Sequence, residues 1–224
     1  MVNAAASPWS ISPAPRRPQG SETAAPRLLS GLGACEPVIY ASDLPGAGAK
    51  ERLVQRLLAS LPGQETAGAG QWAPGRVSLE LTALGQPRLF LGGQPGPALS
   101  FSQAAGRLWA ALTPVGQVGV DAAMPTEFEA GYPLARAFRP AELDWARPLC
   151  GGATAGAAAL LWAVKEAAVK ALGVGFHFLD PLAVEVLSPR PWQEGWRVLV
   201  KAGRVLPAWA RPEAGGWLAI ARYY

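Results

Sequence analysis

The segment Leu161-Trp162-Ala163-Val164-Lys165-Glu166-Ala167-Ala168-Val169-Lys170-Ala171-Leu172 carries more information about the fold than any other part of the chain. It follows Thr154, a good helix-capping residue, and stops at Gly173, so the sequence predicts a helix between them. An apolar face at helical spacing consists of Leu161, Val164, Ala168 and Ala171. A second face carries Trp162, Glu166 and Lys170. We therefore expect one face to pack and the other to present charge.

A carboxylate also stands at the end of a predicted strand earlier in the chain, in Val118-Gly119-Val120-Asp121. A strand-end carboxylate beside a carboxylate on a helix can hold a hard divalent ion. Each feature has an ordinary structural interpretation as well. Glu166 and Lys170 could form a surface pair worth roughly 0.2–0.5 kcal/mol to the helix, and Asp121 could be a turn or cap residue.

Taken together, the two segments resemble the signature motifs of the 4′-phosphopantetheinyl transferases. Gly119-Val120-Asp121 is similar to the first motif, and the run from Trp162 to Gly175 is similar to the second, Trp-x-x-Lys-Glu-Ala-x-x-Lys-x-x-Gly-x-Gly. The likeness extends roughly from Val38 to the C-terminus. The other segments that carry it are Phe138-Arg139-Pro140-Ala141-Glu142-Leu143, Asp180-Pro181-Leu182, Gly85-Gln86-Pro87 and Leu99-Ser100-Phe101-Ser102.

The order of predicted elements gives an α+β fold. A helix followed by three strands is expected in both halves, over 50–112 and 154–223, with a further helix over 140–149. The strands expected from apolar patterns cover 38–40, 76–82, 108–112, 117–121, 182–187, 196–201 and 217–223. Two similar halves in a pseudo-twofold arrangement resemble the larger monomeric, surfactin-synthetase-activator type of the family.

Three regions are predicted along the chain. Residues 1–36 are rich in Pro and Ala and are expected to be a mobile extension. An N-terminal α+β half is expected over 37–115, and a C-terminal α+β half with the metal and phosphate motifs over 116–224.

The resemblance implies transfer of the 4′-phosphopantetheine group of coenzyme A to a serine of an apo acyl or peptidyl carrier protein, with magnesium as cofactor. Asp121 and Glu166 are the residues that it assigns to the metal. Lys165 and Lys170 are suited to phosphate oxygens as point charges. Glu166, directly or through a metal-bound water, is the preferred base for the serine proton, and Lys170 is the second choice.

The nucleotide site is expected to depart from the family pattern. A third metal carboxylate of many larger members is Ala123 here, so water is expected to complete the coordination. The family's Lys in Gly-Lys-Pro is Gln86, its His in Ser-His-Ser is Phe101, and the arginine-rich run before the first helix is reduced. The residues expected to contact coenzyme A are Lys165, Lys170, Arg56, Gln86, Pro87, Arg88, Ser100 and Phe101.

The carrier-protein surface is expected between the two motifs. Phe138, Leu143 and Trp145 could meet an apolar patch of the carrier, while Arg136 and Arg139 meet its acidic helix. Packing of the apolar residues in the core and solvation of the arginines is an equally good interpretation.

Composition agrees with a compact enzyme. The chain has 224 residues, half of them hydrophobic, and can bury a sizeable core. Its net charge of +4 comes without a dense basic cluster beyond Arg16-Arg17, so a nucleic-acid partner is not expected. No apolar stretch approaches the length needed to span a membrane, the start of the chain shows no secretory signal, and two cysteines fit a reducing compartment. We expect a cytoplasmic monomer.

The single histidine, His177, follows Gly175 in an apolar Phe-His-Phe run, and a packing role is favoured over a catalytic one. Two other functional classes stay open. The chain could be a degenerate family member that binds coenzyme A or a carrier protein without catalysis, or an unrelated basic binding module with chance motif matches.

Overall fold

The computed structural model describes residues 25–32, 37–61, 77–129 and 131–224. Its helices are α1 (Ala49–Ala59), α2 (Pro140–Leu149) and α3 (Thr154–Ala171), with short 3-10 turns η1 (Pro125–Phe128), η2 (Leu134–Arg136) and η3 (Pro181–Ala183). Its strands are β1 (Arg27–Leu29), β2 (Val38–Asp43), β3 (Val77–Leu81), β4 (Pro87–Leu91), β5 (Gln94–Pro95), β6 (Ala98–Ala104), β7 (Arg107–Thr113), β8 (Gln117–Ala123), β9 (Glu185–Val186), β10 (Arg190–Trp192), β11 (Gly195–Lys201), β12 (Val205–Glu213) and β13 (Gly216–Tyr223).

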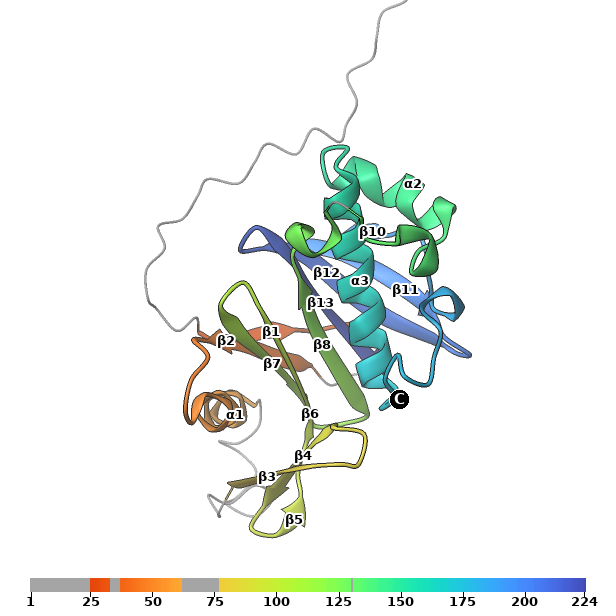
Figure 1. Cartoon of the computed structure of the whole chain (residues 1–224). Coiled ribbons are helices and arrows are strands. Elements are labelled where there is room, and N and C mark those ends of the chain that lie inside the picture. The colour runs from red at the N-terminus through yellow and green to blue at the C-terminus, as the bar shows by residue number, and fades with distance from the viewer. Residues whose placement is uncertain (1–24, 33–36, 62–76, 130) are drawn as a thin grey trace, which may run out of the picture.

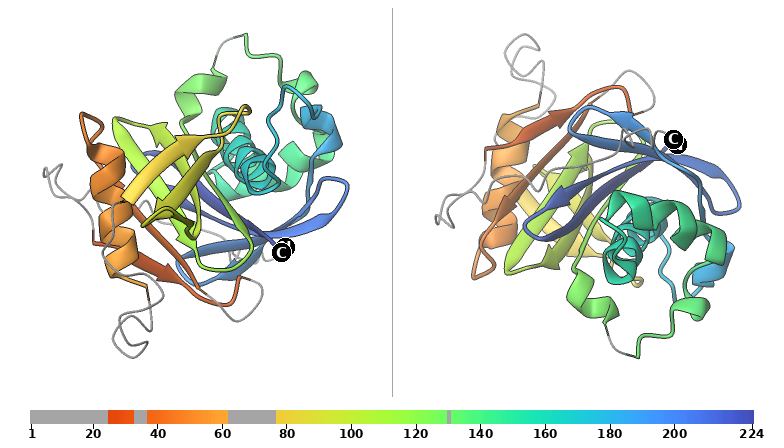
Figure 2. Two further views of the ribbon diagram at one scale, coloured as in Figure 1. Left: turned by 90° about the horizontal axis from the view of Figure 1, so that it is seen from below. Right: turned by 90° about the horizontal axis from the view of Figure 1, so that it is seen from above.

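The described strands form antiparallel sheets. One has the order β1-β2-β7-β6, and a larger one has the order β10-β11-β12-β13-β8, with β9 paired to β11. A small sheet of β3, β4 and β5 lies below them (Figure 1). Helix α1 covers the outer side of the first sheet, while α2 and α3 lie on one side of the larger sheet (Figure 2).

Strand β8 divides its residues between two cores. Val118 and Val120 face the core between the two large sheets, together with Tyr40, Trp109, Trp209, Leu218 and Ile220. Gly119, Asp121 and Ala123 alternate with them and face the other side of the sheet, because side chains of a strand alternate. Ala123 belongs to the core beneath α3. The alternation predicted for this strand is confirmed.

Helix α3 lies unusually close to β8. A Cβ built on Gly119 would stand 1.9 Å from the backbone oxygen of Ala167 and 2.6 Å from the backbone nitrogen of Ala171. Glycine at 119 and alanines on the helix therefore allow backbone-to-backbone packing of strand and helix. This packing brings the last turns of α3 next to Asp121.

The predicted helices are confirmed, with one difference in capping. Thr154 is the first residue of α3, and its N-cap is Ala153, which makes no side-chain capping bond. The helix ends as predicted at Gly173, whose φ is +73°. Its N–H bonds to the Lys170 carbonyl and that of Val174 to the Val169 carbonyl, which is the hydrogen-bond pattern of a Schellman motif.

Several strand predictions were wrong or incomplete. The strand expected over 182–187 is a 3-10 turn followed by the two-residue β9, and the nine-residue β12 was not expected. Strands β7 and β8, joined by a tight connection as expected, belong to different sheets. Arg27–Leu29, placed by prediction in a mobile extension, form β1, and Leu29 is buried. Residues 1–24 and 33–36 of that extension lie outside the described residues.

The structure agrees with a mixed α+β fold, but it does not confirm two similar halves. The helix of the N-terminal half packs on a four-stranded sheet, whereas α3 packs on a larger one, and the β3–β5 sheet adds to one half only. None of the described helices combines the length and the apolar character that crossing a membrane requires.

Candidate functional site

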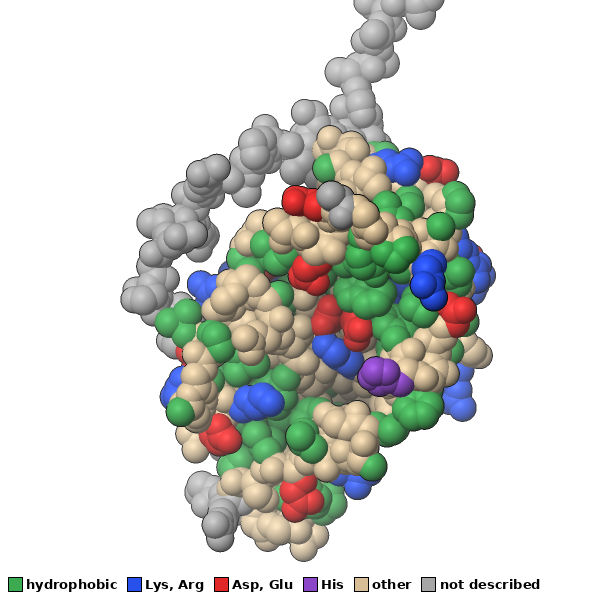
Figure 3. Space-filling model, in the orientation of Figure 1, with side chains coloured by type: hydrophobic (Ala, Val, Ile, Leu, Met, Phe, Trp, Pro, Cys, Tyr) green, Lys and Arg blue, Asp and Glu red, His purple; other side chains and the backbone are tan. Residues whose placement is uncertain are grey.

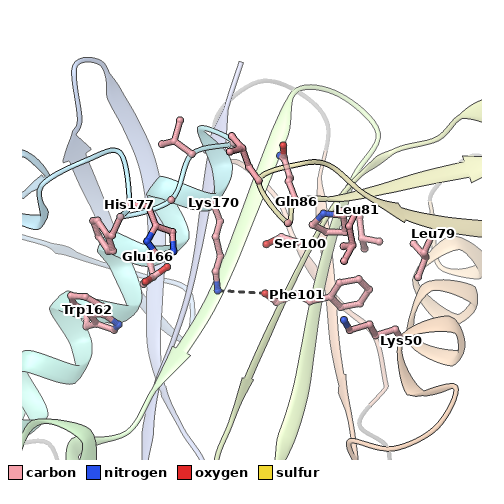
Figure 4. Close-up of a pocket in the computed structure, with 18 of the residues that line it drawn as sticks. Lys50, Leu79, Leu81, Gln86, Ser100, Phe101, Trp162, Glu166, Lys170 and His177 are labelled. Carbon is pink, nitrogen blue, oxygen red and sulfur yellow. Dashed lines mark hydrogen bonds between the residues drawn. The ribbon is translucent and has the colours of Figure 1, made fainter.

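A cleft of about 660 Å³ lies between the N-terminal half and the C-terminal end of α3 (Figure 4). The wall from the N-terminal half includes Lys50, Leu79, Leu81, Gln86, Pro87, Ser100 and Phe101. The facing wall includes Trp162, Glu166, Lys170, Phe176 and His177. Acidic, basic and histidine side chains gather around the hollow on this face of the molecule (Figure 3). The helical face predicted to present charge therefore faces a cleft.

Lys170 and Asp121 form an ion pair beside this cleft. The Nζ of Lys170 lies 2.6 Å from Oδ1 of Asp121, and it also donates to the backbone oxygens of Val120 at 3.2 Å and Phe101 at 3.4 Å. Burial raises the pKa of Asp121, while the charge of Lys170 and its hydrogen bond oppose that rise. The sequence allowed a surface pair of Lys170 with Glu166 on the same helix. In the structure Lys170 instead bonds to Asp121, and this bond connects helix α3 to strand β8.

Two serines join the edges of β6 and β8 under the same site. Ser100 Oγ accepts from the backbone N–H of Val120 at 3.1 Å, and Ser102 Oγ accepts from that of Ala122 at 3.1 Å. Ser102 in turn donates to Asp121 Oδ1 at 2.8 Å. These bonds hold the carboxylate in one orientation and connect the two large sheets at the site. Ser102 was not among the predicted site residues.

Glu166 lies one helical turn before Lys170, and its half-buried carboxylate points into the cleft (Figure 4). Burial raises the pKa of Glu166, and the nearby charge of Asp121 raises it further. The charges of Lys170 and His177 act in the opposite direction. A carboxyl group with a raised pKa is a better proton acceptor than an ordinary one.

Lys165 does not reach the cleft, so its expected role at phosphate is wrong in this structure. Its side chain is fully buried, and Nζ bonds to Glu142 Oε2 at 3.0 Å and to the backbone oxygens of Ala137 at 2.8 Å and Pro181 at 3.0 Å. Burial lowers the pKa of Lys165, and the Glu142 charge opposes this. Glu142 also accepts from the backbone N–H groups of Arg139 and Val186. The pair ties α2, α3 and β9 together.

The expected nucleotide contacts divide into two groups. Gln86, Pro87, Ser100 and Phe101 all line the cleft. Arg56 and Arg88 do not: Arg56 donates to the Ser42 carbonyl at 3.4 Å, and Arg88 is exposed on β4. Lys50 does line this wall, and its ammonium group lies 5.4 Å from the centre of the Phe101 ring.

The predicted carrier-protein surface is only partly at the surface. Phe138 and Leu143 are buried in the core beneath α3, so the packing interpretation holds for them. Trp145 is half-buried against the same core. Arg136 is exposed, and Arg139 pairs with Glu185 at 3.4 Å and donates to the Leu182 carbonyl.

His177 is exposed and lines the cleft, which overturns the packing role expected for it. Phe176, its neighbour, does pack: its ring lies 5.1 Å from that of Trp162. Of the two phenylalanines in the Phe-His-Phe run, Phe176 packs against the protein, whereas Phe178 is 69% exposed. A glycine before the run was the sequence signal that its residues could turn in different directions.

The donor set at the cleft fits a magnesium ion. Asp121 and Glu166 supply hard carboxylate oxygens close enough for one charge to raise the pKa of the other, and a cation between them would offset that repulsion. Within the described residues no group of three or more His, Cys, Asp or Glu side chains is placed to hold a metal. Ala123, the position at which the resemblance expects a third metal carboxylate, is buried in the core.

A cleft lined by Glu166, Lys170 and Lys50, with Asp121 bonded to Lys170 beside it, is suited to transfer of a phosphate-linked group. Residues 117–206 match the family model described as the 4′-phosphopantetheinyl transferase superfamily. The matched segment contains Glu166, Lys170 and His177, which line the cleft, and Asp121, which is bonded to Lys170 beside it, and the match supports a transferase of this kind. No protein with a curated description matches the chain.

Proposed function

We propose that this protein transfers the 4′-phosphopantetheine group of coenzyme A to a serine of an apo acyl or peptidyl carrier protein. The observation that carries the proposal is the ion pair of Lys170 with Asp121 beside the cleft that Lys170 and Glu166 line, inside the segment that matches the superfamily. Coenzyme A and a carrier protein are the partners that this activity requires.

The cleft residues have distinct tasks in this reaction. Asp121 and Glu166 would hold a magnesium ion, which would neutralise charge on the diphosphate when bound. Lys170 keeps Asp121 in place and adds positive charge on the same side of the cleft. Gln86, Ser100 and Phe101, with Lys50 beside them, form the wall against which the nucleotide would lie.

The transfer is a displacement at phosphorus. The serine oxygen of the carrier protein bonds to the β-phosphorus of coenzyme A, the bond from that phosphorus to the bridging oxygen breaks, and 3′,5′-adenosine bisphosphate leaves. Glu166 accepts the serine proton, because its raised pKa favours protonation. Lys170 is the weaker candidate for this task, since its ammonium group is already bonded to the Asp121 carboxylate.

The proposal is tested by mass measurement of carrier proteins. Purified protein is incubated with coenzyme A, magnesium and a panel of apo-carrier proteins, and at least one carrier should gain the mass of one phosphopantetheine group. Asp121→Ala and excess chelator should each abolish the gain. A panel that stays unmodified with a folded protein would refute the activity.

A second candidate function is binding without transfer. Gln86 and Phe101 line the cleft where the resemblance expects lysine and histidine, and Ala123 offers no third carboxylate. A protein that retains coenzyme A in equilibrium dialysis but never modifies a carrier would match this alternative.

A further inference from the structure

The loop after α3 presents His177 to the cleft in a fixed position. The Schellman bonds at Gly173 and Val174 fix the helix end, and the N–H of Phe178 bonds to the Gly175 carbonyl at 2.9 Å, which closes a turn over 175–178. His177 is the third residue of this turn. The turn is anchored on one side by the ring contact between Phe176 and Trp162.

The far end of the loop is anchored as well. Asp180 accepts from the N–H of Leu182 at 2.8 Å, and buried Lys165 donates to the carbonyl of Pro181 at 3.0 Å. The near end approaches the opposite wall, because a Cβ on Gly173 would stand 3.1 Å from the side-chain oxygen of Gln86. The loop that carries His177 is therefore held at both ends, and its near end lies against Gln86 of the opposite wall.

The imidazole of His177 can offer a hydrogen-bond donor to a ligand in the cleft. Its imidazole lies beside the Glu166 carboxylate and on the same side of the cleft as Lys170 (Figure 4). Its imidazole is exposed, lines the cleft and takes part in none of the hydrogen bonds between the described residues. On the opposite wall, position 101 carries an apolar phenylalanine ring that donates nothing.

We propose that His177 binds the diphosphate of coenzyme A through an imidazole N–H. This inference rests on the proposed function and names a further substrate contact within the same cleft. A neutral imidazole already carries one N–H donor, so the contact does not depend on the charge of the ring. The position beside Glu166 places the donor where the transferred phosphate must lie if Glu166 takes the serine proton.

The experiment is equilibrium binding of coenzyme A in the presence of magnesium, by calorimetry on the full chain. His177→Ala should weaken binding about tenfold or more, since a hydrogen bond to a charged group is lost. His177→Phe should weaken it equally, because the ring is kept and the N–H removed. The matched control is Phe178→Ala: this side chain lies on the same turn, is 69% exposed and does not line the cleft, so binding should be unchanged.

The outcomes separate this inference from the proposed function. If wild type does not bind coenzyme A, the proposed function fails and this contact with it. If wild type binds and His177→Ala or His177→Phe binds equally well, the contact alone is refuted. Repeating the series with 3′-dephospho-coenzyme A should give the same fold loss. A loss that disappears with this probe would place His177 at the 3′-phosphate and overturn the assignment to the diphosphate.

Discussion

Substitution of Gly119 by alanine should damage both the stability and the chemistry of this protein. The new Cβ would lie 1.9 Å from the Ala167 backbone oxygen, and carbon atoms at this position are essentially never found closer than 3.0 Å to a neighbour. Helix and strand must therefore separate by about 1.1 Å, the difference between the two distances. Neither neighbour is a flexible side chain that could move aside, because both clashing atoms belong to the backbone of α3.

The size of the effect follows from that shift. Forcing one extra methyl group into a packed contact costs about 1–3 kcal/mol and sometimes more. The 2.6 Å bond between Lys170 and Asp121 spans the same interface, and a shift of this size would take it past the limit of about 3.2 Å for a hydrogen bond. A misplacement of about 1 Å at a reacting site can lower the rate about 10²-fold.

The assay combines chemical denaturation with the rate of phosphopantetheine transfer. Gly46→Ala is the matched control, because a Cβ there meets nothing within 4 Å and the residue has an ordinary φ. We expect the control to behave as wild type. Gly119→Ala with the wild-type midpoint of unfolding would show that α3 does not lie as close to β8 as described, and the account of how Asp121 reaches the helix would fail. If Gly119→Ala loses stability but keeps the wild-type transfer rate, only the expected effect of the helix–strand distance on the reaction is refuted.

Lys165→Ala should lower the free energy of unfolding by about 3–5 kcal/mol because it leaves the Glu142 carboxylate buried alone. The double variant Lys165→Met with Glu142→Leu should recover much of that free energy. If Lys165→Ala is instead stable and binds coenzyme A weakly, Lys165 contacts phosphate after all. The transfer rate, measured against pH, should fall as pH drops through the raised pKa of Glu166. If the rate falls only at the pH where an ordinary carboxyl group is protonated, Glu166 is not the base. Leu29→Ala should cost about 2–5 kcal/mol in thermal unfolding while the 52% exposed Leu28→Ala costs little, and equal effects would mean that β1 is not packed.

The parts of the fold that were predicted are those with strong local periodicity. The α3 segment repeats apolar residues at helical spacing, and β8 alternates between two faces, so neither required knowledge of the rest of the chain. Strand β12 was missed because Pro207 and Pro212 interrupt it, and proline argues against a central strand. Pairing with both β11 and β13 outweighs that local preference.

The short strand β1 shows a different limit. Its neighbourhood is rich in proline and alanine, so composition indicated an extension. Three residues are too few to show a period, and what fixes β1 is its register on β2 and the burial of Leu29 against Trp109 and Trp209 in the core between the sheets. Such contacts join distant parts of the chain and leave no local signal.

The site shows the same division. Asp121, Glu166 and Lys170 were predicted together as site residues; Glu166 and Lys170 line the cleft, and Asp121 is bonded to Lys170 beside it. The bond between Lys170 and Asp121 could not be predicted, because it depends on how closely Gly119 lets the helix approach the strand. His177 was assigned to packing, since a turn that sends Phe176 inward and His177 outward is set by contacts with α3 and not by the three residues themselves.

Lys165 is the instructive exception, because the sequence did contain the signal for its position. Successive helical residues are turned by about 100°, so Lys165 points well away from Glu166, whereas Lys170 lies nearly above it. Lys165 shares its face with Leu161 and Val169, four residues before and after, and both are fully buried. Periodicity therefore places one lysine in the core and the other at the cleft, although chemical type alone makes the two equivalent. A buried lysine then requires an anionic partner, and Glu142 provides it.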